Sequence, residues 1–444
     1  MSAISQTKSL LSLSGPSVLR RNISFAAVQA VMSLSVVFLA YRLLIRHAGL
    51  EVLGLWSLLT AGSVAARLAD ISGAGGLARF VAEERAADRN PNLHVHTVVL
   101  TSLAMNGLLS GALFLASGRL IAHFIETRHQ AMAVDLVPWA ILLIGLLMPL
   151  VTAITSAVDG LQRADIRAKV TIGSLVVFLG GCLVLIPRYG IWGFLAAQAA
   201  QQILVLVACW IVLRCYSPEL GLIPHRWSGP VFRQTAAYGL KMQANALAGM
   251  LSDPVAKMLL SQWGGLSAVA VYELAARLVL GMRSLLVQAA QPLIPAFAEQ
   301  SSNRAQLKQL LRRSSRMTGK AVALSALVVA LASPAYNYFM LGELSNAFMG
   351  TLFFLIVGYG INSLAVPYYF LGTAINVMRW NIASQVLMAI CIAVAGAVFG
   401  PRFGGVAIIG GVVIGLILGA VVVCLGNSAT LRPVVNSPES EIAQ

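Results

Sequence analysis

The sequence predicts an all-α membrane protein of about twelve transmembrane helices, arranged as two parallel-repeat six-helix bundles around a central cleft. Of its 444 residues 58% are hydrophobic and only 11% are charged, and the mean hydropathy is +0.82, so an ordinary water-facing surface is excluded. Apolar stretches of about 20 residues recur, each long enough to cross a hydrocarbon core roughly 30 Å thick. The two halves also resemble each other.

The chain is divided into elements at charged or Pro/Gly-rich breaks. The expected spans are 22–41, 52–77, 95–117, 136–158, 169–186, 191–213, 235–256, 267–297, 319–340, 346–370, 380–399 and 404–425. The domain organisation that follows is a cytoplasmic tail (1–18), an N-terminal six-helix bundle (19–215), a cytoplasmic linker (216–234), a C-terminal six-helix bundle (235–426) and a disordered cytoplasmic tail (427–444).

The distribution of basic residues predicts the orientation. With the N-terminus inside, most of the 31 lysines and arginines fall on the cytoplasmic side, which is the usual bias of membrane proteins. Both termini are therefore expected in the cytoplasm. The net charge of +15 then follows from topology and from attraction to anionic lipids, and nucleic acid is not an expected partner.

An internal repeat accounts for the number of helices. One shift along the chain lays Leu58 on Leu274, Arg67 on Arg283, Leu77 on Leu293 and Glu83 on Glu299, and a nearby shift lays the turn at 187–190 on that at 401–404. Six helices separate the copies, so the two halves should have the same orientation in the membrane. A cleft between two such bundles is the usual architecture of a secondary transporter.

Several charges inside the expected spans are the candidate functional residues, because a charge at the bilayer centre costs about 2.5–3.5 kcal/mol on insertion scales. Arg67 and Asp70 are three residues apart, and Glu273 and Arg277 are four apart, so both pairs can meet on a helix. They are either structural ion pairs or part of a transport site. Asp70 and Glu273 are also candidates for coupling to protons or sodium ions.

Arg283 and Lys241 have no acid within one turn, and Arg283 is the repeat partner of Arg67. We expect cavity cations at Arg67, Arg283, Lys241 and Arg277, which indicates an anionic substrate, since guanidinium groups suit phosphate. A structural role is the alternative. Asp253 has two readings as well: an interfacial ion pair with Lys257, or a third ion-coupling carboxylate.

The remaining patterns give no sign of an enzyme. There is no GxxxxGK[ST], HExxH or GxSxG motif in the sequence, so neither ATP hydrolysis, a catalytic metal nor a cofactor is expected. The five cysteines lack ligand spacing. Six tryptophans near the expected span ends are interpreted as interface anchors: Trp56, Trp139, Trp192, Trp227, Trp263 and Trp380.

Three segments carry a family resemblance. The run GLEVLGLWSLLTAGSVAARLADISGAGGLARFVAEE (49–84) resembles the second-helix region of polysaccharide flippases of the O-antigen and exopolysaccharide type. SDPVAKMLLSQWGGLSAVAVYELAARL with PLIPAFAEQ (252–300) is similar to their seventh and eighth helices, and DGLQRADIRAK (159–169) to their fourth-to-fifth helix loop. The resemblance implies a bacterial inner-membrane flippase whose cationic cleft carries an undecaprenyl-diphosphate-linked oligosaccharide to the outer leaflet by alternating access, for surface polysaccharide biosynthesis.

Two alternatives remain. Multidrug and toxin extrusion antiporters share the superfamily, and they would favour acidic rather than basic cavity residues. A membrane glycosyl polymerase or ligase would carry a substantial catalytic outer loop, whereas every expected outer loop is short. The partners expected for the flippase are the lipid-linked oligosaccharide, membrane lipids, and the polysaccharide polymerase and export machinery.

Overall fold

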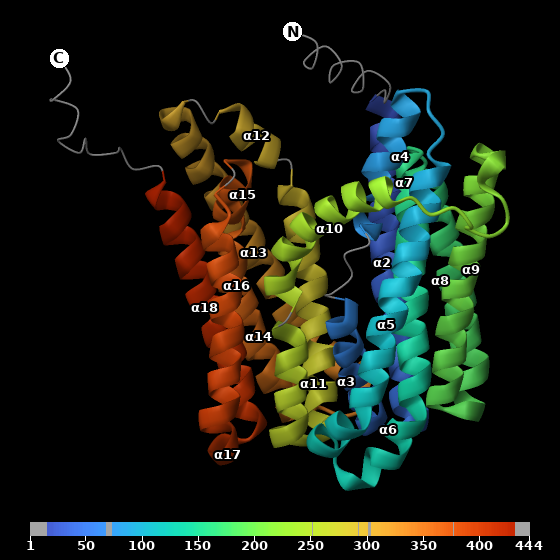
Figure 1. Cartoon of the computed structure of the whole chain (residues 1–444). Helices are drawn as coiled ribbons and strands as arrows, with labels where there is room; N and C mark the ends of the chain where they lie inside the picture. Colours follow the sequence, from blue (N-terminus) through green and yellow to red (C-terminus); the bar gives the residue numbers. More distant parts are fainter. Residues whose placement is uncertain are drawn as a thin grey trace. The chain divides into compact units, whose positions relative to one another are not determined.

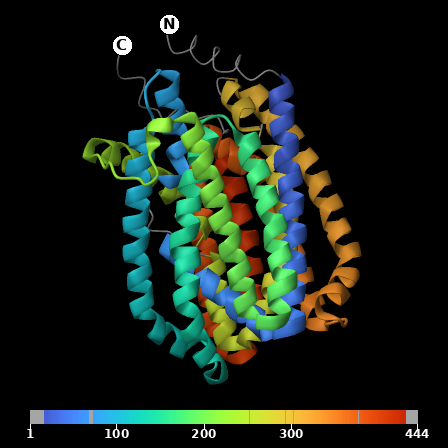
Figure 2. The same cartoon turned by 90° about the vertical axis from the view of Figure 1, so that its right-hand side faces the viewer.

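A computed structural model of the chain describes residues 16–67, 73–250, 252–291, 293–300, 303–375 and 377–430. Within these residues every regular element is a helix. The chain forms two compact units, Met1–Leu247 and Ala248–Gln444, and Figures 1 and 2 show two views of their helices. The all-α prediction is confirmed.

The first unit is built from long helices joined by short turns. Figures 1 and 2 show α8 and α9 side by side along their whole length. The helices are α2 (Pro16–Ala48), α3 (Leu50–Arg67), α4 (Leu77–Ala86), α5 (Asn92–Phe124), α6 (Thr127–Ala140), α7 (Met148–Gly160), α8 (Ala164–Tyr189), α9 (Ile191–Tyr216) and α10 (Gly229–Met250), with the 3-10 turns η1 (Ala74–Gly76) and η3 (Pro218–Leu220) and the π-helical segment η2 (Ile141–Leu147).

The second unit has the same construction. In it α16 packs along α18, and α14 packs against α11, α13 and α18. Its helices are α11 (Ser252–Ala290), α12 (Leu293–Glu299), α13 (Arg304–Leu341), α14 (Asn346–Leu364), α15 (Val366–Ala374), α16 (Arg379–Val394), α17 (Gly400–Phe403) and α18 (Gly405–Ala429), with a second π-helical segment, η4 (Ala395–Phe399).

The helices agree with the expected spans. In the described residues nine helices are long and apolar enough to cross a membrane. Of the three other expected spans, 22–41 lies within α2, 52–77 overlaps α3 but runs beyond its end to the first residue of α4, and 235–256 overlaps α10 and the start of α11. Each of α2, α3 and α10 includes residues whose side chains lie outside the described part of the chain. The protein is therefore a multi-pass membrane protein.

The repeat is visible in the backbone turns. Gly190, between α8 and α9, has φ 56° and ψ −127°, and Gly404, before α18, has φ 58° and ψ −143°. Gly49, between α2 and α3, and Gly265, within α11, both have positive φ, at 94° and 75°. The shift that relates Gly49 to Gly265 also relates Leu77 and Leu293, the first residues of the short helices α4 and α12.

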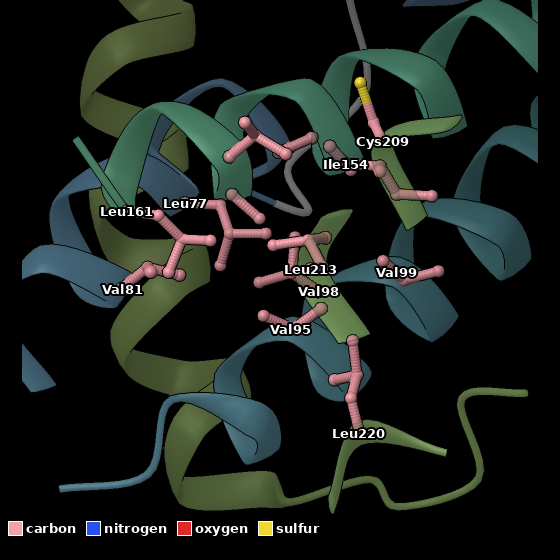
Figure 3. Packing of buried hydrophobic residues seen from close by; sticks show 14 of the residues in the cluster. Leu77, Val81, Val95, Val98, Val99, Ile154, Leu161, Cys209, Leu213 and Leu220 are labelled. Carbon is pink, nitrogen blue, oxygen red and sulfur yellow. The ribbon is translucent and has the colours of Figure 1, made fainter. Parts of the chain in front are cut away.

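Each short helix is fixed by a hydrophobic cluster. In the first unit, Leu77 and Val81 of α4 pack with Val98 of α5, Leu161 beyond α7 and Leu213 of α9 (Figure 3). In the second unit, Phe297 of α12 is fully buried in a cluster with residues of α13 and α15. Burial of these apolar side chains fixes α4 and α12 to the helices of their own units.

The division between units lies within α10. The expected C-terminal bundle starts at 235, whereas the first unit extends to Leu247. The reason is contact with α4: the Tyr238 ring lies 5.6 Å from that of Phe80, and the Arg79 guanidinium lies 5.1 Å from the same tyrosine ring. A Cβ at Gly73 would also overlap the carbonyl oxygen of Thr235. The start of α10 thus packs as part of the first unit.

Candidate functional site

The site in the second unit begins with a hairpin inside α11. Gly265 has φ 75° and ψ 175°, a non-helical conformation in the middle of the α11 range. Lys257 and Glu273 lie on either side of it and form an ion pair with Nζ and Oε2 2.7 Å apart. In a straight helix, residues with this spacing would be about 24 Å apart along the axis. The chain therefore folds back at Gly265, which separates the expected seventh and eighth spans.

The hairpin is closed by a chain of alternating charges. Besides Glu273, Lys257 also pairs with Asp253, with Nζ 2.7 Å from Oδ2. Glu273 in turn accepts from Nε of Arg277 at 2.5 Å. The side chains of Lys257 and Glu273 are 7% and 4% exposed, whereas those of Asp253 and Arg277 are 43% and 42% exposed. Two buried charges are thus linked to two partly hydrated ones, and the four formal charges cancel.

Arg283 lies farther along α11 and has different partners. Its Nη2 donates to Oδ1 of Asn362 at 3.0 Å, and its guanidinium carbon lies 6.0 Å from the centre of the Tyr359 ring. Asn362 is itself fixed, because its Nδ2 donates to the Leu416 carbonyl at 3.1 Å. The Nε of Arg283 is buried and has no hydrogen-bond partner among the described residues. Such a donor requires an acceptor, because an unsatisfied buried polar group costs about 1–3 kcal/mol.

A polar cavity adjoins this arginine. Its volume is about 250 Å³, and helices α11, α14, α15, α16 and α18 contribute its walls. The polar residues of the lining are Arg283, Asn362, Tyr369, Ser384 and Gln385. No acid is among the described residues that line it. One permanent cation among hydroxyl and amide groups suits an oxyanion or a hydroxylated ligand.

The predicted site residues fall into two groups. Asp253, Glu273, Arg277 and Arg283 are all on α11, where the first three share the charge network and the last lines the cavity. Arg67 is the last residue of α3 and Lys241 belongs to α10, but their side chains lie outside the described part, as does the whole of Asp70. The roles predicted for all seven residues therefore stay predictions.

Two residues of this region do more than the sequence predicts. The ion pair of Asp253 with Lys257, one of the two readings of Asp253, is present, but Lys257 is buried and also pairs with Glu273. A spacing of four residues predicts the first contact, whereas the second requires the chain reversal at Gly265. Asn362 carries no sequence signal of this kind, because an isolated amide in an apolar span shows its role only when its partner Arg283 is placed beside it.

Charged side chains in the first unit gather at its two ends. At one end, the guanidinium groups of Arg85 and Arg163 lie 6.0 and 5.3 Å from the centre of the Tyr216 ring. These are residues of α4, of the turn before α8 and of the end of α9. At the other end, Arg128 pairs with Glu51 at 2.7 Å. The loops expected on one side of the membrane are thus brought together within this unit.

Comparison with known proteins identifies the fold. An inward-facing multidrug resistance MATE family transporter of the MOP superfamily has a TM-score of 0.71 at 16% identity, over 90% of this chain and 94% of that one. The lipid II flippase MurJ, in an inward closed conformation, has a TM-score of 0.71 at 12% identity, over 91% of this chain and 87% of that one.

A third structure, a MOP superfamily transporter from Pyrococcus furiosus whose binding pocket is described as having reverse polarity, has a TM-score of 0.58 at 13% identity, over 93% of this chain and 95% of that one. No curated protein matches the sequence. A family described as polysaccharide biosynthesis protein matches residues 53–343, which is more than half of the chain. The chain therefore belongs to the polysaccharide biosynthesis protein family and has the fold of the MOP superfamily transporters, as the resemblance of its helical segments predicted.

Proposed function

We propose that this protein is a flippase that carries an undecaprenyl-diphosphate-linked oligosaccharide from the cytoplasmic to the outer leaflet by alternating access, for the synthesis of a surface polysaccharide. Its family and fold support a flippase-type transporter. A sugar diphosphate cannot cross hydrocarbon unaided, because burying an ion without partners is costly. A protein that moves it must supply a hydrated, cationic path.

The observation that carries the proposal is the cavity beside Arg283. Arg283 lines this cavity, and its guanidinium is held in place by Asn362 and Tyr359. A phosphate in the cavity would pair with the guanidinium and neutralise its charge. The neighbouring hydroxyl and amide groups of Tyr369, Ser384 and Gln385 suit the sugar hydroxyls. The repeat assigns a matching role to Arg67, with Lys241 and Arg277 as further cations.

Drug extrusion is the second candidate, because a MATE transporter has the same TM-score as the lipid II flippase. An organic cation would need a carboxylate in its binding cavity. The described cavity carries a cation instead, and this difference favours an anionic substrate.

The proposal places the protein in the bacterial inner membrane with both termini in the cytoplasm. The gathering of Arg85 and Arg163 around Tyr216, away from the Arg128–Glu51 pair, agrees with the basic side being cytoplasmic. Cysteine-accessibility labelling in intact cells tests this orientation. A cysteine at Arg163 should react only after the membrane is permeabilised, and one at Arg128 should react from outside.

Coupling to protons or sodium ions, through Asp70, Asp253 or Glu273, is part of the proposal. Of the two described acids, Asp253 is the better candidate, because its carboxylate is 43% exposed and has one lysine partner. Both oxygens of Glu273 are held by cations. Transport into vesicles with imposed pH or sodium gradients should lose its gradient dependence in Asp253→Asn. Unchanged gradient dependence in this variant would remove Asp253 from the coupling role.

The experiment that tests the function is deletion of the gene followed by mass analysis of lipid-linked oligosaccharides. The carrier-linked sugar should accumulate, facing the cytoplasm. Arg283→Ala and Arg67→Ala should fail to complement although they insert normally, whereas Arg402→Ala, at an exposed position in α17, should complement. Unchanged glycolipids with new drug sensitivity would replace the proposal with the extrusion function. Full complementation by Arg283→Ala would remove the arginine from the site.

A further inference from the structure

An apolar hollow lies on the first unit, between the α6–η2 segment and α9. Its volume is about 420 Å³. One wall consists of Trp139, Leu142, Leu143 and Leu147, and the other of Trp192, Leu195, Ala196, Ala199 and Ile203. Both walls belong to helices long and apolar enough to span a membrane. An apolar hollow between two helices of this kind suits a hydrocarbon chain.

The hollow is formed by a local distortion of the helix. Pro138 interrupts the helical hydrogen-bond ladder near the end of α6, and the following seven residues, Ile141–Leu147, are π-helical. A π turn is wider than an α turn and displaces the residues after it along the helix face. On its other side this segment is fixed to α5, because a Cβ at Gly145 would overlap the Ser110 hydroxyl. The distortion is thus built into the packing of the unit.

The opposite wall is a regular stripe. Its residues on α9 lie three, four, seven and eleven positions after Trp192, so they share one face of the helix. Two of them are alanines, Ala196 and Ala199, which leave room between the larger side chains. From Trp192 to Ile203 the stripe extends about 16 Å at 1.5 Å per residue. That is about half of a hydrocarbon core roughly 30 Å thick, so the hollow is about one leaflet deep.

Two exposed indoles mark the headgroup end of the hollow. The side chains of Trp139 and Trp192 are 56% and 41% exposed, which is typical of tryptophans at the membrane interface. Trp192 follows Gly190, which packs against Ala48 at the end of α2, whereas Tyr216 at the far end of α9 lies beside Arg85 and Arg163. The hollow therefore starts at the end of the unit that is expected to face outward.

We propose that this hollow binds the polyprenyl chain of the lipid-linked substrate in the outer leaflet. The inference rests on the proposed function. While the headgroup crosses through a polar path, the tail stays in hydrocarbon, so the protein contacts it on a lipid-facing surface. A single chain lying along α9, with its diphosphate at the tryptophan end, matches the depth, the apolar walls and the orientation of the hollow.

Photocrosslinking of the purified full-length protein in nanodiscs tests the inference. A polyprenyl diphosphate probe with a photoreactive group in its chain should label peptides from 139–147 and 192–203. Excess unlabelled polyprenyl diphosphate should compete, whereas excess phospholipid should not. Ala199→Trp, which fills the hollow, should reduce the labelling at least fivefold. The matched variant Ala200→Trp, at an exposed neighbouring position outside the hollow, should label like the parent protein.

Two outcomes would overturn the inference. One is competition by phospholipid as effective as by polyprenyl diphosphate, which would make the occupant an ordinary membrane lipid. The other is equal labelling of the Ala199→Trp and Ala200→Trp variants when both have the thermal stability of the parent. Flipping of lipid-linked oligosaccharide into vesicles is measured in parallel. If the parent flips the substrate but the hollow is not labelled, the inference fails alone, and if the parent does not flip it, the proposed function fails.

Discussion

The strongest quantitative prediction concerns the two carboxylates that share Lys257. Both lie 2.7 Å from its Nζ, but Asp253 is 43% exposed and Glu273 only 4%. Lys257→Met would remove one of the cations that pair with the buried Glu273. Breaking a buried ion pair by removing one partner costs about 3–5 kcal/mol, because the buried charge that remains loses its compensation from that partner. Asp253→Asn breaks a pair with a partly hydrated acid and should cost about 0.2–1 kcal/mol, since water screens such pairs.

Thermal unfolding of the purified protein measures this difference. For a domain of 150–250 residues, 1 kcal/mol shifts the melting temperature by about 2–4 °C. Lys257→Met should therefore lower it by about 6–20 °C, and Asp253→Asn by no more than about 4 °C. The double variant Lys257→Met with Glu273→Met should recover most of the loss, because apolar side chains can replace a buried ion pair without a stability cost, while the half-exposed Arg277 keeps its hydration.

The reasoning would be refuted by either of two results. If Asp253→Asn and Lys257→Met lowered the melting temperature equally, burial would not be what sets the strength of the network. If the double variant were no more stable than Lys257→Met, the loss would come from packing of the lysine side chain rather than from an uncompensated carboxylate.

Three further predictions follow from the same contacts. Asn362→Leu should reduce transport about tenfold without affecting insertion, because Arg283 loses the acceptor that positions it; transport equal to the parent would contradict this role. Gly265→Ala should destabilise the protein by about 1–3 kcal/mol, because its positive φ with an extended ψ is a backbone conformation that residues with a Cβ rarely adopt. Gly410→Ala, in open space, should not destabilise it, and thermal unfolding measures both. Gly160→Ala should lower the melting temperature and the expression level, since its Cβ would lie 2.6 Å from the Ala78 carbonyl oxygen. The control is Gly173→Ala, where nothing lies within 4 Å of the added Cβ. Equal stability of the two variants would show that α4 moves freely.

The fold was largely predictable because hydropathy and length report directly on the membrane. The expected spans coincide with helices, and the turns at Gly190 and Gly404, aligned by the repeat, have nearly the same backbone conformation. Local spacing also predicted the contact between Glu273 and Arg277, which are four residues apart on one helix.

Local spacing does not predict contacts between residues that are far apart in the sequence. Lys257 meets Glu273 only because the chain reverses at Gly265, and Arg283 meets Asn362 of another helix. Trp56 shows the same limit: it was expected at the membrane interface, yet it is 2% exposed and packs against Phe194, with ring centres 5.5 Å apart. A side chain's position along a span is readable from the sequence, whereas the direction it faces depends on helices far away in the chain.

The hairpin at Gly265 has a neutral counterpart in the other half. The shift that relates Gly49 to Gly265 lays Tyr41 on Lys257 and Ser57 on Glu273, and both of these residues are buried, at 4% and 1% exposure. The bend is thus common to both halves, while the two positions that carry the Lys257–Glu273 ion pair in the C-terminal half carry uncharged side chains in the N-terminal half. Separating the two arms of the Gly265 hairpin would leave the buried charges of Lys257 and Glu273 without each other, which costs free energy. Separating Tyr41 from Ser57 carries no such electrostatic cost. In a rearrangement that engages both bends, the C-terminal one is therefore the stiffer.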